Sequence, residues 1–186
     1  MIYNTVKDYV KELCGKPENF LTASFFNEHV LIVADYCNQL SRLLTADNEI
    51  VCISAYLHDV SAILDFKTLA THNINSSEIA ESFLMKIGYP DDKVVRIKQC
   101  IMNHTTPIRI GERAIEDVVL SNADAISQII NPAFWLYFVF KIRNMGFEDG
   151  KLWYLNKINT NWNLLIDPAK KLIEDKYLLL NKCLSK

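Results

Sequence analysis

Apolar residues recur every three or four positions along most of this chain, which is the spacing of helices that bury one face. The first such segment covers residues 2–13 and is followed by Gly15 and Pro17, two residues that commonly end a helix. The second begins near Phe26 and keeps its apolar stripe as far as Leu44. The pattern therefore predicts two helices in this part of the chain, the second of them long.

A third helix is predicted after Asp47, whose carboxylate can cap its N-terminus. Its buried side runs through Val51 and Ala55 to His58, and Asp59 follows directly. A histidine and an aspartate at the end of an apolar stripe need polar partners, because an unpaired polar group is costly to bury.

Residues 60–74 show no sustained period, so we expect an irregular connection there. Its length makes it a candidate functional loop. Asn75 and Glu78 have the spacing of a capping box, which predicts a helix over residues 76–87. His72 is then expected just ahead of a helix N-terminus.

The remaining pattern is helical as well, and the chain contains only five glycines and five prolines for turns. The predicted segments are residues 94–104, ended by Pro107; 113–129, ended by Pro132; 132–143; and 147–183, with a break at Asp167 and Pro168. No repeat or linker interrupts them. The sequence therefore predicts one all-α domain over residues 1–186.

Charge and hydropathy narrow the possible partners. The 186 residues carry 20 Lys and Arg against 22 Asp and Glu, so no broad basic field is expected to hold a nucleic acid polymer or an anionic membrane. The longest apolar run, Ala133 to Phe140, is far shorter than the roughly 20 residues of a membrane-spanning helix. The first residues do not resemble a secretory signal, so we expect a cytoplasmic protein.

Five cysteines are scattered through the chain without a Cys-x-x-Cys pair. Their odd number and wide spacing disfavour a disulfide framework or a zinc ribbon. We expect all five to be small buried residues in a reducing compartment: Cys14, Cys37, Cys52, Cys100 and Cys183.

The histidines form the main candidate for chemistry. All four fall at predicted helix ends or on apolar stripes, and two aspartates occupy comparable positions: His29, His58, His72, His104, Asp59 and Asp124. One such histidine is more often a satisfied core residue than a ligand. For the set, we favour a shared divalent cation, because one ion can satisfy several buried imidazoles and carboxylates at once.

His29, the His58-Asp59 doublet and the later Asp124 resemble the H…HD…D signature of the HD-domain superfamily of metal-dependent phosphohydrolases. The resemblance covers roughly residues 20–130 and implies an HD-type helical bundle. His72 and His104 resemble two further positions of members that bind two metals. The C-terminal stretch is similar, more loosely, to small bacterial HD proteins regarded as nucleotide pyrophosphohydrolases.

The resemblance implies roles for these residues. His29, His58 and Asp124 would complete one metal site, His72 and His104 a second, and Asp59 would bridge the two ions and act in catalysis. Ligands of this type, without thiolates, suit Mn²⁺, Fe²⁺, Co²⁺, Zn²⁺, Mg²⁺ or Ni²⁺, one or two ions in all. A water activated by the metal would supply the nucleophile.

The substrate contacts are less clearly indicated. Many relatives carry an Arg where this chain has Ile32, and some carry a Lys near Ser61 and Ala62. Lys67 and Arg113 are candidate phosphate ligands, or else solvated surface charges.

Three further features have two interpretations each. Asp65 is a candidate general acid or an ordinary loop carboxylate. Glu116 is either a support for a ligand histidine or part of an exposed helix turn. The aromatic cluster between Phe134 and Phe140 is favoured as core over a base-stacking platform.

The favoured hypothesis is a hydrolase of a small phosphorylated molecule, in particular a nucleotide in view of the resemblance, with no action on nucleic acid polymers. Two alternatives stay open. One is an HD-type di-iron oxygenase, which would share the ligands; the other is an HD-fold ligand-binding or regulatory module. The sequence leaves the oligomeric state open.

Overall fold

The structure is a computed structural model that describes residues 2–105, 111 and 113–185. Within these residues all regular structure is helical, so the all-α prediction is confirmed. The elements are α1 (Ile2–Cys14), η1 (Phe26–Val30), α2 (Leu31–Leu44), α3 (Asn48–Leu57), α4 (Val60–Leu64), η2 (Phe66–Thr71), α5 (His72–Lys86), α6 (Asp91–Asn103), α7 (Ile115–Ile130), α8 (Pro132–Tyr137), η3 (Phe138–Ile142), α9 (Phe147–Leu164) and α10 (Asp167–Leu184).

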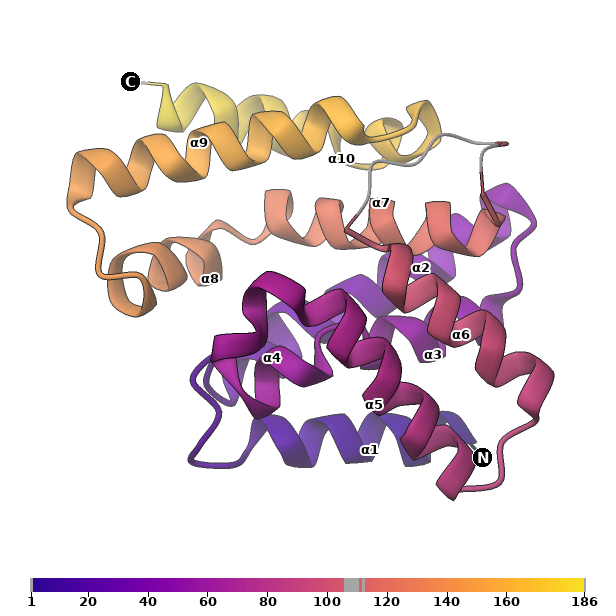
Figure 1. Cartoon of the computed structure of the whole chain (residues 1–186). Coiled ribbons are helices and arrows are strands. Elements are labelled where there is room, and N and C mark those ends of the chain that lie inside the picture. Colours follow the sequence, from indigo (N-terminus) through magenta and orange to yellow (C-terminus); the bar gives the residue numbers. More distant parts are fainter. Residues whose placement is uncertain (1, 106–110, 112, 186) are drawn as a thin grey trace.

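The helices pack in layers around α3 and α7 (Figure 1). Helix α3 is buried along its length from Ile50 to Leu57, which explains why its sequence is apolar on all sides. Helices α9 and α10 lie side by side and cover α7, while α1 lies at the opposite edge of the molecule. One continuous cluster of buried side chains runs from Val6 on α1 to Ile173 on α10.

Several helix boundaries follow the sequence prediction closely. The carboxylate of Asp47 accepts hydrogen bonds from the amides of Glu49 and Ile50, as predicted for the cap of α3. The break between α9 and α10 falls at residues 165–166, just before the predicted one. The predicted end of α6 at Pro107 lies outside the described residues, and α6 itself ends at Asn103.

The prediction of an irregular connection over residues 60–74 is wrong. This stretch contains α4 and the short 3₁₀ helix η2, and α5 already begins at His72. The apolar residues of α4, including Val60 and Ile63, are buried, but five residues are too few to show a period.

The predicted capping box at Asn75 is also wrong, because Asn75 lies within α5 and donates a hydrogen bond to the hydroxyl of Thr71. Tertiary hydrogen bonds hold the first turn of α5, which precedes the predicted start of this helix. The Ser61 hydroxyl donates to the carbonyl of His72, and the side-chain amide of Asn73 donates to the carbonyl of Met102. His72 is therefore the first residue of its helix, not a residue ahead of it.

Four of the five cysteines are buried, as predicted, whereas Cys183 near the end of α10 is exposed. The aromatic cluster is largely core: Phe134, Trp135 and Phe138 are each at least nine-tenths buried. Among the described residues, no single helix has both the length and the apolarity needed to cross a membrane. One pair, Ile115–Ile130 with Pro132–Ile142, meets that test by length and composition only, across a bend of 75°.

Candidate metal centre and pocket

Six side chains from five places in the fold converge at one point. His29 comes from the π-helical turn η1, His58 from the residue after α3 and Asp59 from the kink between α3 and α4. The others are His72 at the start of α5, His104 after α6 and Asp124 within α7. These are the six residues that the sequence singled out as metal ligands.

The six residues form two adjacent groups that share Asp59. In the first group, the Nε2 atoms of His29 and His58 lie 3.2 and 3.3 Å from Oδ2 of Asp59 and 3.0 Å from each other. Oδ1 of Asp124 lies 3.4 Å from His29 Nε2.

The second group uses the other oxygen of Asp59. Its Oδ1 lies 3.3 Å from Nε2 of His72, which lies 3.0 Å from Nε2 of His104. Both groups have ligand atoms close enough together to hold a metal ion. Each oxygen of one carboxylate thus faces a different pair of imidazoles.

All four imidazoles are held through their Nδ1 atoms. Nδ1 lies 2.7 to 2.8 Å from a backbone carbonyl in three of them, those of His58, His72 and His104. The fourth, His29, places Nδ1 2.8 Å from the hydroxyl of Ser127. Because that hydroxyl donates to the carbonyl of Asp124, it accepts the proton of His29 Nδ1.

This arrangement leaves lone pairs on the Nε2 atoms. A neutral imidazole that donates through Nδ1 has only an acceptor at Nε2, so the two Nε2 pairs at 3.0 Å cannot hydrogen-bond without an added proton or cation. The two carboxylates beside them add negative charge. The donor set therefore fits a divalent cation of the first transition row, with imidazoles fixed by outer hydrogen bonds as in many metal sites.

The pKa values of these side chains follow from the same crowding. Burial alone would lower the pKa of His58, but the carboxylates of Asp59 and Asp124 raise it to about 9. Burial and the charge on His58 lower the pKa of His104 to about 4. The imidazoles outweigh the effect of burial on Asp59 and hold its pKa well below the usual range. The negative charge of Asp59 and Asp124 thus favours positive charge at this centre, which a bound cation would supply.

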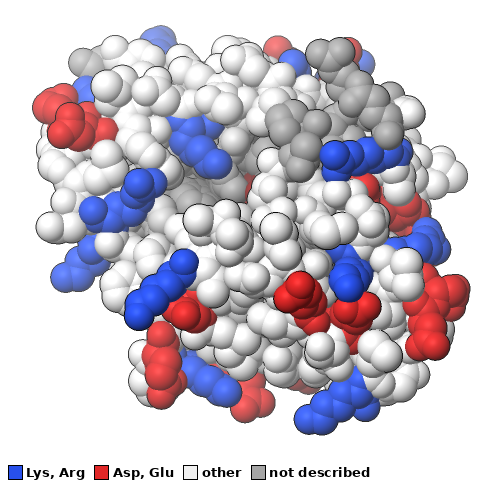
Figure 2. Space-filling model, in the orientation of Figure 1, with Lys and Arg blue, Asp and Glu red and all other residues white. Residues whose placement is uncertain are grey.

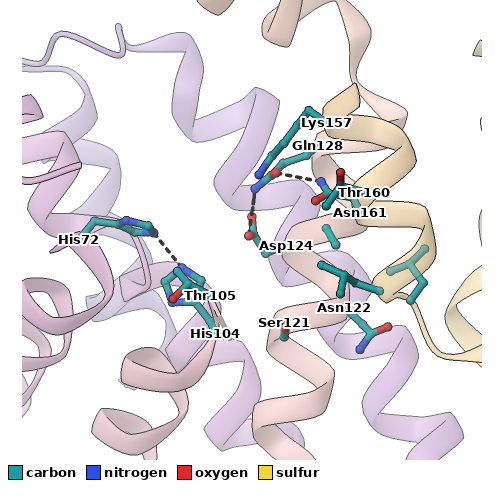
Figure 3. A pocket seen from close by; sticks show the side chains of 13 residues that line it. His72, His104, Thr105, Ser121, Asn122, Asp124, Gln128, Lys157, Thr160 and Asn161 are labelled. Carbon is teal, nitrogen blue, oxygen red and sulfur yellow. Dashed lines mark hydrogen bonds between the residues drawn. The ribbon is translucent and has the colours of Figure 1, made fainter. Parts of the chain in front are cut away.

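A cavity of about 200 Å³ opens beside this centre. His72, His104 and Asp124 line one part of it, and helix α9 supplies the wall across from the histidines with Lys157, Thr160 and Asn161 (Figure 3). Ser121, Gln128 and Thr105 contribute further polar groups. The cavity is therefore lined by a potential metal centre on one side and by hydrogen-bonding groups on the other.

A chain of amide groups connects α9 to Asp124. Nε2 of Gln128 donates to both carboxylate oxygens of Asp124 at 2.9 Å, and Oε1 of Gln128 accepts from Nδ2 of Asn161 at 2.9 Å (Figure 3). With its oxygen engaged by Asn161, the Gln128 amide must present its nitrogen to Asp124. Helix α9 thus fixes the orientation of one candidate ligand.

The other residues singled out from the sequence lie elsewhere. Asp65 is an exposed cap of η2 that accepts from the amide of Lys67, and the Lys67 side chain is exposed too. Arg113 is exposed and lies two residues before α7 begins at Ile115. None of the three lines the cavity, so the geometry gives no support to roles in catalysis or phosphate binding.

Glu116 fits neither of its two interpretations. Its Oε1 accepts from the amide of Asp47 at 3.1 Å and from Arg96 at 3.0 Å, which ties the starts of α3 and α7 to α6. It therefore stabilises the packing of three helices.

Sequence reasoning missed the residues of α9 and the amide of Gln128. Gln128 lies one helical turn after Asp124, and Lys157 and Asn161 are one turn apart on α9. A search for polar residues at this spacing could have found them. It could not have shown that α9 faces the histidines, because that depends on the packing of α9 on α7.

Comparison with known proteins agrees with this geometry. Residues 26–129 match the family model of the HD domain, and the match contains all six converging residues. The chain belongs to the HD domain family. Helices α8, α9 and α10 follow the matched segment, so the α9 wall of the cavity lies outside it.

Related proteins show the same fold. Bacillus subtilis YpgQ is 18% identical with a TM-score of 0.70, covering 98% of this chain and 91% of YpgQ. YpgQ in complex with ADP gives 19% identity, a TM-score of 0.69, and coverage of 98% and 94%. A predicted HD superfamily hydrolase from an uncultured Thermotogales bacterium is 17% identical with a TM-score of 0.58, covering 92% of this chain and 91% of that protein.

A curated relative is similar over a shorter stretch. An uncharacterized protein of Clostridium beijerinckii is 32% identical over 79 residues, which is 41% of this chain. The matched stretch spans 50% of that relative's length.

Proposed function

We propose that this protein is a metal-dependent phosphohydrolase that cleaves a phosphate ester or anhydride bond of a small phosphorylated molecule, a nucleotide in particular. One observation carries the proposal: two metal-ligand groups share the carboxylate of Asp59 beside a polar cavity. Membership of the HD domain family supports it.

The ligands divide between two positions. His29, His58, Asp59 and Asp124 would hold one divalent ion, and Asp59, His72 and His104 a second. When bound, such ions neutralise phosphoryl oxygens and lower the pKa of a water molecule, which is the chemistry that phosphate hydrolysis needs. Asp59 fixes both positions relative to each other, and Gln128 with Asn161 orients Asp124.

Size and charge support a small anionic substrate. A cavity of about 200 Å³ has room for a phosphate group and part of what it is attached to. Figure 2 shows acidic and basic side chains interspersed on the drawn face, with a hollow near its centre and no continuous basic stripe. Long nucleic acids are bound along such stripes, so we expect little activity on polymers. The complex of YpgQ with ADP supports a nucleotide as the substrate class.

The test combines metal analysis with a substrate panel. Purified protein is loaded in turn with Mn²⁺, Co²⁺, Mg²⁺, Fe²⁺, Zn²⁺ and Ni²⁺, and phosphate or pyrophosphate release is measured from nucleotides and sugar phosphates. We expect release that depends on added metal and is lost in Asp59→Ala. DNA and RNA serve as the polymeric comparison.

Two results would contradict the proposal. Metal binding without release from any compound, at the level of the Asp59→Ala control, would favour the ligand-binding or regulatory module. Consumption of O₂ by the iron-loaded protein, without phosphate release, would favour the di-iron oxygenase.

A further inference from the structure

Helix α9 brings a cation to the cavity. Lys157 is the only lysine or arginine among the described residues that line it. Its side chain is half-buried, and no carboxylate within the described part of the chain forms an ion pair with it. An ammonium group at a cavity wall, without a carboxylate partner in the described part of the chain, favours an anion in the cavity.

Neutral donors surround the same space. Ser121 and Thr160, which both carry hydroxyl groups, line the cavity. In Figure 3 Lys157 and Thr160 lie on the wall across from His72 and His104. A phosphate group has several acceptor oxygens, so a wall with one ammonium group and nearby hydroxyls is suited to hold it.

Lys67 and Arg113, the phosphate ligands expected from the sequence, do not line this cavity. The cation that reaches the cavity comes instead from α9, outside the segment that matches the HD domain. The metal ligands and the substrate contact thus come from separate parts of the chain. These parts meet where α7, which carries Asp124, packs against α9.

We propose that Lys157 binds the phosphate group of the substrate directly. The inference rests on the proposed function, because it assigns the ligand of the same cavity. Since the ammonium group is in place before the reaction, its contact is made in the bound substrate as well as in the transition state. Its loss should therefore raise KM more than it lowers kcat.

The test compares three variants with the wild type. Lys157→Met removes the charge and keeps most of the side-chain length, and Lys157→Arg keeps the charge. Lys151→Met is the matched control, because Lys151 lies on the same helix, pairs with Glu148 and does not line the cavity. Circular dichroism and Tm establish that each variant is folded.

Binding is measured first, with inorganic phosphate as the probe and calorimetry as the readout, in the presence of Mg²⁺. We expect Lys157→Met to weaken phosphate binding about 10-fold or more, the usual scale for a hydrogen bond to a charged group. Lys151→Met should leave it unchanged, and Lys157→Arg should retain most of it. With a hydrolysed compound, KM should rise about 10-fold in Lys157→Met while kcat changes less than about 3-fold.

The outcomes separate this inference from the proposed function. Equal phosphate binding by wild type, Lys157→Met and Lys151→Met would overturn the role of Lys157, even with hydrolysis intact, and so would a wild type that binds no phosphate. Weaker binding in Lys157→Met alone, without hydrolysis of any compound, would support the role of Lys157 and count against the proposed reaction.

Discussion

The shared carboxylate of Asp59 gives the sharpest prediction. Replacing it by Asn keeps the size of the side chain but removes one negative charge. It also replaces one oxygen by an amide nitrogen, which has no lone pair to offer a metal. Because Oδ2 faces His29 and His58 whereas Oδ1 faces His72, one of the two groups must lose its oxygen. The oxygen that remains no longer carries a share of a negative charge, so Asp59→Asn should impair both metal positions at once.

The expected magnitude follows from linkage between binding and folding. An ion present at 100 times its Kd stabilises the native state by about 2.7 kcal/mol. For a chain of 186 residues, this raises Tm by about 5–11 °C per ion. Changes in the outer hydrogen bonds of a ligand alone cost about 10- to 100-fold in metal affinity, so loss of a ligand oxygen should cost about 100-fold or more. At the same metal concentration, the stabilisation then falls to about 0.4 kcal/mol, a shift of about 1–2 °C.

The assay is a thermal melt with and without Mn²⁺ or Co²⁺, combined with metal analysis of the dialysed protein. Asp35→Asn is the control, since Asp35 is exposed on α2 and bonded only to Gln39 among the described residues. His72→Ala should remove one ion and part of the shift, because it affects only the second group. A full metal-induced shift and unchanged metal content in Asp59→Asn would refute the bridging role.

Three further predictions concern residues other than the metal ligands. Asp47→Ala should lower the free energy of unfolding by about 1–2 kcal/mol at pH 7 in urea titrations, through loss of the α3 cap and of the contact with Arg96. Burial alone would raise the pKa of Asp47, but hydrogen bonds from α3 amides and from Arg96 lower it. The part of this deficit that depends on the carboxylate charge should therefore be complete above the usual carboxyl pKa and should be lost as the pH falls through the lowered one. Gly150→Ala should lower the free energy of unfolding by about 1–3 kcal/mol, and with it Tm, because the added methyl group would lie 2.5 Å from an aromatic carbon of η3. An unchanged Tm would mean that α9 can shift away from η3. Asn161→Leu should lower kcat about 10-fold with little change in KM, because the Gln128 amide that orients Asp124 loses its partner. A rise in KM as large as the fall in kcat would contradict a positioning role.

Much of the fold was predictable because helix signals are local. The cap at Asp47 and the stripe from Phe26 to Leu44 depend on residues within a few turns of one another, and the structure has helices there. The start of α5 was not predictable in this way. Asn75 and Glu78 have the spacing of a capping box, but contacts of the preceding turn with α4 and α6 outweigh it.

The candidate ligands were also recognisable from the sequence, because a polar residue that ends an apolar stripe needs a buried partner. The sequence did not indicate that His29 lies in a π-helical turn, and the exposed positions of Asp65 and Lys67 followed only from the folded chain.

The sequence by itself determined the helical class of this protein and the six side chains that converge, since periodicity and residue chemistry are properties of the chain. The tertiary structure decided how these side chains are used. It places one oxygen of Asp59 before each pair of imidazoles, fixes the Nδ1 atoms and brings Lys157 to the cavity. These relations join residues up to about a hundred positions apart, and their distances are set by helix packing: α7 packs against α2 and α9, and α6 packs against α3 and α5.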